Sequence, residues 1–117
     1  MTLSLKVLST GPDSVVAVEG TLDVATTDEF VAGAVRVLQS TSGRLLLDFA
    51  GVEFCDSTGL AGLVRLRRVA SSHGVAVQLV NAPPRMRGRL RMTGLDALFG
   101  GVGEGENGGP ENPGSRT

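Results

Sequence analysis

The sequence contains no tryptophan or tyrosine, and it has only one cysteine among its 117 residues. The lone Cys55 excludes an intramolecular disulfide, which fits a reducing compartment. No apolar run reaches the length needed to cross a bilayer. The N-terminal residues Met1–Lys6 lack the basic start and long apolar stretch of a signal peptide. We therefore expect a soluble, cytoplasmic protein without a membrane partner.

Aromatic residues are also scarce, since the chain has only four phenylalanines, and the formal net charge is small, at −1. Acidic residues are absent from Ser57 to Leu95, so this half of the chain carries a local positive field. The arginines responsible are Arg65, Arg67, Arg68, Arg85, Arg87, Arg89 and Arg91. Nucleic acid is nevertheless not an expected partner, because stacking aromatics and an overall basic balance are both missing.

Catalytic groups are few as well. A nucleophilic Ser57 would need an adjacent base, and the only histidine, His73, lies sixteen residues along the same predicted helix. That separation corresponds to about 24 Å. The carboxylates of Asp48, Glu53 and Asp56 form only a weak metal pattern, and a solvated loop is the favoured interpretation. We expect no catalytic residue, no metal and no cofactor, and we expect Cys55 to be a small buried hydrophobe.

Hydrophobic residues make up 41% of the chain, enough for one domain with one core. Periodicity predicts two strands, a helix, a strand, a helix, a strand and a helix. This order indicates a single α/β domain with a mixed sheet flanked by helices. The expected elements are strands at Leu3–Val7 and Val15–Val18 (ended by Gly20), a helix at Asp23–Ser40, a strand at Leu45–Leu47, a helix at Ser57–Ser72, a strand at Val75–Val80 and a helix from Asn81–Pro84 to Gly94.

Local signals mark several boundaries. Thr26 followed by Glu29 matches a capping box for the first helix. Leu95–Phe99 is expected to pack back as a short terminal segment. The glycine-rich stretch 100–117 has no periodicity and is predicted to be a disordered C-terminal tail, which leaves residues 1–99 as the domain.

The most informative stretch runs from Leu45 to Leu66. The short apolar strand is followed by a turn-rich segment, Asp48–Asp56, and then by a helix start in which either Asp56 or Ser57 acts as the N-cap. A hydroxyl at such a position is ordered and can accept a phosphate, whose charge the helix N-terminus favours. We hypothesise that Ser57 is a regulatory phosphoacceptor, with the neighbouring Thr58 a less favoured one.

The helix that follows has two predicted faces. A wheel centred on Leu66 buries Gly59, Gly62, Leu63, Leu66, Val69 and Ala70 against the sheet. The same wheel places Leu60, Ala61 and Val64 on the outer face. These three residues form an apolar patch rimmed by arginines, which is typical of a protein-docking surface. The alternative is that Leu60 and Val64 are covered by the loop or by a neighbouring helix.

From about Leu3 to Phe99 the chain resembles the STAS domain, in particular the bacterial anti-sigma factor antagonists. The resemblance rests on Leu45–Phe49 and Val52–Leu60, supported by Gly20–Asp23 and by Thr93–Leu95 with Leu98-Phe99. It implies a STAS-like mixed sheet and identifies Ser57 as the phosphorylated serine. It also implies that Asp23 lies near the phosphosite and contacts the kinase.

The resemblance further implies a partner-switching function. The unphosphorylated protein would bind an anti-sigma factor, itself a serine kinase, and free a sigma factor. Phosphorylation would end that binding, and a PP2C-type phosphatase would reverse it, so ATP and Mg²⁺ belong to the partner. The expected partner-binding residues are Asp23, Asp56, Ser57, Thr58, Gly59, Leu60, Ala61 and Val64. The alternative is a non-switched STAS subunit of a cytoplasmic complex such as a lipid-transport ATPase.

Overall fold

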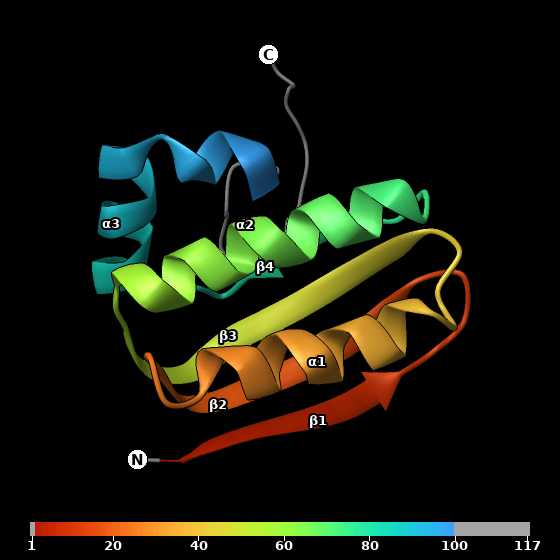
Figure 1. Ribbon diagram of the computed structural model, residues 1–117, viewed down its shortest axis with the longest axis horizontal. Helices are drawn as coiled ribbons and strands as arrows, with labels where there is room; N and C mark the ends of the chain where they lie inside the picture. The colour runs from red at the N-terminus through yellow and green to blue at the C-terminus, as the bar shows by residue number, and fades with distance from the viewer. Residues whose placement is uncertain (1, 100–117) are drawn as a thin grey trace.

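The computed structural model describes residues 2–99 and shows one four-stranded sheet with strand order β1-β2-β3-β4 (Figure 1). β1 and β2 pair antiparallel, while β2, β3 and β4 run parallel. This confirms the expected mixed sheet and the expected order of elements. Their bounds are β1 Leu3–Ser9, β2 Ser14–Leu22, α1 Thr27–Leu38, β3 Arg44–Cys55, α2 Ser57–Ser72, β4 Ala76–Val80, α3 Pro84–Thr93 and the 3-10 helix η1 Leu95–Phe99.

Helices α1 and α2 lie side by side across the same face of the sheet (Figure 1). The core between these layers is aliphatic, with an edge-to-face pair of Phe30 and Phe49 whose ring centroids are 6.2 Å apart. Two glycines of α2 permit the close packing. A Cβ built on Gly59 would lie 2.8 Å from the Cys55 sulfur, and one built on Gly62 would overlap the Thr27 methyl group. Both glycines are buried as predicted, but Gly62 faces α1 and not the sheet.

The prediction for β3 was too short. The strand does not end at Leu47, because its pairing with β2 continues as far as Leu22 opposite Cys55. Two register shifts along this ladder absorb the turn-forming residues of the segment. For the same reason β2 continues through Gly20, which takes a φ of +110° inside the strand. Tertiary pairing thus overrides local turn signals, and it extends β3 to Cys55, so that only Asp56 separates the strand from α2.

The predicted start of α1 was also wrong. The helix begins at Thr27, not Asp23, and Thr26 makes no side-chain capping bond to it. The Thr26 hydroxyl instead donates to the Thr21 carbonyl at 2.6 Å and accepts from the Asp23 amide at 3.1 Å. The residues between β2 and α1 therefore form a structured loop, in which the hydroxyl holds the loop backbone and does not cap the helix.

The C-terminal part matches expectation where the structure describes it. Met86 and Leu90 of α3 are buried, and α3 ends at Gly94 in the left-handed conformation with a φ of +76°. Phe99 of η1 is buried against the core. The predicted tail, 100–117, lies outside the described residues. Within residues 2–99, none of the helices is long and apolar enough to cross a membrane.

Candidate functional site

The start of α2 presents two exposed hydroxyls. Asp56 is the N-cap, and its carboxylate accepts a hydrogen bond from the Gly59 amide at 3.0 Å. Ser57 and Thr58 are the first two helical residues, and both are exposed. Because Asp56 performs the capping, the choice left open by the sequence is settled. The Ser57 side chain is not the residue that caps the helix.

The β2–α1 loop lies directly beside this helix start. The amide of Asp56, the N-cap residue, donates to the Leu22 carbonyl at 3.1 Å. Asp23 is the residue that follows Leu22 in the chain. Asp23 is half-buried, and its carboxylate accepts from the Ala25 amide at 2.9 Å. The structure thus brings the segments carrying Asp23 and Ser57 together, although they are more than thirty residues apart in the sequence.

The three apolar residues expected on the outer face of α2 do not share one environment. Ala61 is exposed and Val64 is half-buried. Leu60 is only 7% exposed and belongs to the core, so its assignment to a docking patch was wrong. Figure 1 shows α3 beside the N-terminal end of α2, and Leu60 belongs to the same buried cluster as Met86 and Leu90 of α3. The wheel centred on the sheet-facing side of α2 therefore drew the buried arc of this helix too narrowly.

Two exposed hydrophobic residues near this site were not predicted. Val24, in the β2–α1 loop, is 80% exposed, and Phe54, near the end of β3, is 42% exposed. Phe54 pairs in register with Thr21, which places it beside the same loop. The exposure of Phe54 could have been predicted from the sequence. An aromatic residue in a turn-rich segment does not belong to a periodic pattern that would place it in the core. Val24 and Phe54 add exposed apolar surface to the segments next to the α2 start.

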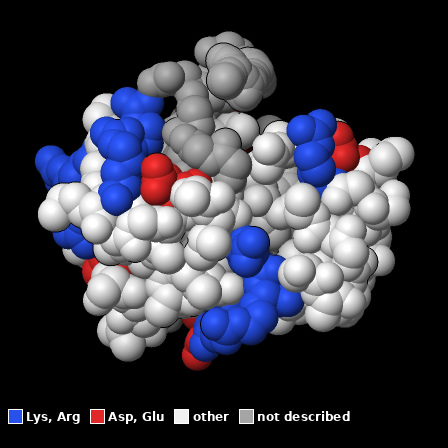
Figure 2. All heavy atoms as spheres, turned by 90° about the horizontal axis from the view of Figure 1, so that it is seen from above, with Lys and Arg blue, Asp and Glu red and all other residues white. Residues whose placement is uncertain are grey.

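The arginines of α2 contact other elements of the protein. Arg65 pairs with Asp28 of α1 at 2.9 Å, and the Arg67 Nε donates to the Leu98 carbonyl of η1 at 2.9 Å. Two arginines of the predicted rim thus form intramolecular contacts with α1 and η1. Basic side chains gather more densely over α3, at the left of Figure 2. That helix contains Arg85, Arg87, Arg89 and Arg91 and no acidic residue.

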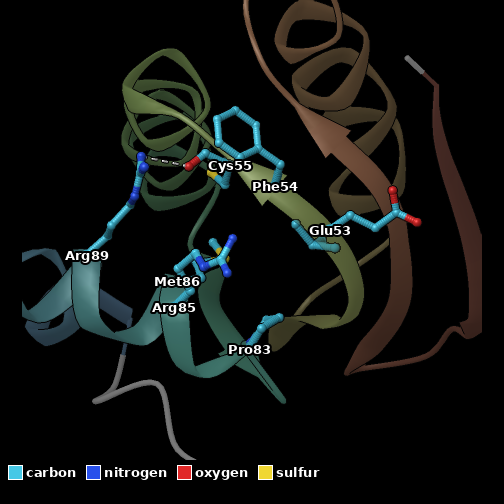
Figure 3. A pocket seen from close by; sticks show the side chains of 8 residues that line it. Glu53, Phe54, Cys55, Pro83, Arg85, Met86 and Arg89 are labelled. Carbon is cyan, nitrogen blue, oxygen red and sulfur yellow. Dashed lines mark hydrogen bonds between the residues drawn. The ribbon is translucent and has the colours of Figure 1, made fainter.

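A shallow hollow separates α3 from the end of β3 (Figure 3). Arg89 crosses it, and its Nη1 donates to the Cys55 carbonyl at 3.1 Å. The guanidinium carbon of Arg89 lies 5.7 Å from the centroid of the Phe54 ring, within cation–π range. Arg85 and Met86 line the same hollow. The guanidinium of Arg89 is therefore hydrogen-bonded to the backbone of Cys55, two residues before Ser57.

The other chemically reactive groups near the site are Cys55 and several carboxylates. Cys55 is buried, and burial together with the negative charge of Asp56 raises the pKa of its thiol to about 12. Such a thiol stays protonated and unreactive at neutral pH. Within residues 2–99, no cluster of three or more His, Cys, Asp or Glu residues is placed to hold a metal ion. His73 caps the opposite end of α2 from Ser57.

This fold and site define a class of small α/β domains with exposed hydroxyls where a parallel strand meets a helix. The chain belongs to the STAS-domain family, since the family model described as "Mlab, STAS domain" matches residues 5–100. No curated protein matches the sequence.

Solved structures similar to this chain include both regulators and transporter domains. An anti-sigma factor antagonist from Mycobacterium paratuberculosis is 26% identical, with 84% of this chain and 83% of that chain covered and a TM-score of 0.72. The STAS domain of a SulP transporter from Vibrio cholerae is 27% identical, with coverages of 74% and 69% and a TM-score of 0.60. The phosphorylated form of the Bacillus cell fate determinant SpoIIAA is 20% identical, with coverages of 83% and 87% and a TM-score of 0.61, which is a likeness of fold alone.

Proposed function

We propose that this protein is an anti-sigma factor antagonist of the cytoplasm, controlled by phosphorylation of Ser57. In its unphosphorylated form it binds an anti-sigma factor that is a serine kinase, and a sigma factor is released. The kinase transfers a phosphate from ATP to Ser57, which ends the binding, and a PP2C-type phosphatase restores it. Asp23, Asp56, Ser57, Thr58, Ala61 and Val64 contribute to the binding surface in this proposal. Gly59, which the sequence placed on that surface, is buried and supports it from inside.

The observation that carries the proposal is the separation of the cap from the acceptor at the start of α2. Asp56 holds the helix end by its bond to the Gly59 amide, so the exposed Ser57 hydroxyl can be modified without loss of the cap. A phosphate adds about 1.5 to 2 negative charges at pH 7. The buried Gly59 holds this turn close to Leu22 and Cys55, which fixes the position in which the hydroxyl is presented.

The test is to incubate the full chain with serine-kinase anti-sigma factors from the same organism and Mg-ATP, then map any phosphate by mass spectrometry. We expect one phosphate on Ser57 and none on the Ser57→Ala variant. Thr58→Ala serves as the matched control and should still be phosphorylated. A confirmed binding partner with kinase activity that modifies Thr58, or leaves both residues unmodified, would contradict the assignment.

A second candidate function is that of a non-switched STAS subunit in a cytoplasmic complex such as a lipid-transport ATPase. The similarity to a transporter STAS domain from Vibrio cholerae favours it, at 27% identity over a smaller share of the chain. Purification of the tagged protein from its own cells separates the two functions. A transport ATPase recovered with the chain, with Ser57 unmodified under all growth conditions, would support this second candidate.

A further inference from the structure

We infer that Arg89 receives the phosphate of Ser57 within the same molecule, and that this ion pair is part of the phosphorylated state. The inference rests on the proposed function, because it concerns the consequence of phosphorylation at that site. It starts from Arg89, which α3 places against the junction of β3 and α2 (Figure 3).

The position of Arg89 is held by two contacts. Its Nη1 donates to the Cys55 carbonyl at 3.1 Å, and its guanidinium lies over the Phe54 ring at 5.7 Å. Met86 and Leu90, on the same helix, are buried and fix α3 against the core. A guanidinium held in this way loses less conformational freedom on forming an ion pair than a mobile surface arginine does.

Ser57 is close in the chain to the carbonyl that Arg89 binds. It follows Cys55 by two residues, so the two Cα atoms are separated by at most about 7.6 Å. Rotation of the exposed Ser57 side chain, extended by a phosphate, can bring an oxygen to the guanidinium that bonds the Cys55 carbonyl. Arginine has five N–H donors in a planar fork, so the carbonyl bond leaves donors that can serve phosphate oxygens.

The charges around the site favour this particular pair. Asp56 on α2, Asp23 in the β2–α1 loop and Glu53 on β3 are negative and would repel a phosphate. On the positive side, Arg65 is paired with Asp28. Arg85 lines the hollow beside Arg89 and adds to the positive potential there. The positive charge that faces the phosphate therefore lies on α3, where Arg89 is already held in place.

The experiment uses the full chain with phosphoserine installed at position 57 during synthesis, so that no kinase is needed. Phosphorus NMR follows the second pKa of the phosphate, which is about 6 in ordinary phosphoserine. An ion pair favours the dianion and lowers that pKa. We expect Arg89→Gln to raise that pKa by roughly 0.15–0.7 unit, the range of an exposed ion pair.

Arg91→Gln removes the same charge from an exposed position at the end of α3 and is the matched control. Its phosphate pKa should equal that of the unsubstituted protein. Arg89→Lys keeps the charge and should hold the pKa below that of Arg89→Gln. Equal pKa values for Arg89→Gln and the unsubstituted protein, or an equal rise with Arg91→Gln, would overturn the inference. A failure to find a kinase for Ser57 would count against the proposed function and leave this result unaffected.

Discussion

At the scale of single residues, two neighbours at the start of α2 have different roles. Asp56 satisfies a backbone donor of the first turn, while Ser57 is exposed beside it. The sequence alone predicted a cap and a hydroxyl here, because Asp, Ser and Thr all favour helix starts. Which residue caps could not be predicted from residue type. It depends on the backbone at Asp56, which is extended with a ψ of −172° and lets its carboxylate turn back to Gly59.

Substitution of these two residues should therefore affect the stability of the protein to different extents. Asp56→Ala removes the capping bond and should lower the free energy of unfolding by about 0.5–2 kcal/mol. Ser57→Ala should change it by less than about 0.5 kcal/mol, since it alters only an exposed side chain. Urea unfolding followed by circular dichroism measures both values. A larger loss for Ser57→Ala than for Asp56→Ala would show that the serine, not the aspartate, is the structural cap.

At the scale of elements, α2 shows which buried positions of a helix can be predicted from the periodicity of its sequence. The pattern correctly placed Leu63, Leu66 and Ala70 against the sheet, because these positions repeat with the helical period. It failed at Leu60, which is 7% exposed and belongs to the core although the helical period places it away from the sheet. The short prediction for β3 has a similar origin, since its extension depends on the ladder with β2.

Substitutions at the adjacent residues Leu60 and Ala61 should therefore distinguish effects on stability from effects on partner binding. Leu60→Ala should lower the free energy of unfolding by about 2–5 kcal/mol, the range for a truncated core leucine. Ala61→Glu should cost less than about 0.5 kcal/mol, because the side chain points into solvent, but it should weaken binding of the anti-sigma partner. Unfolding curves and partner titrations of both variants test this. An Ala61→Glu variant that binds with unchanged affinity would place the interface elsewhere.

At the scale of the whole molecule, the topology accounts for where the site lies. β2, β3 and β4 are parallel, so the segments that follow them meet at one edge of the sheet. Asp23 follows β2, Ser57 follows β3 and Arg89 lies on the helix after β4. The order of elements was predictable from the sequence, and with it this shared edge. The contact between Arg89 and the Cys55 carbonyl was not, because it depends on the position of α3.

The central claim is that the charge state of Ser57 controls partner binding. The most direct measurement is the affinity of the anti-sigma kinase for the full chain, with serine and with phosphoserine at position 57, by calorimetric titration. An uncompensated charge at an interface can cost several kcal/mol, and each 1.4 kcal/mol is a tenfold change in affinity. The account predicts that phosphoserine weakens binding by at least about tenfold. Equal affinities for the two forms would contradict it.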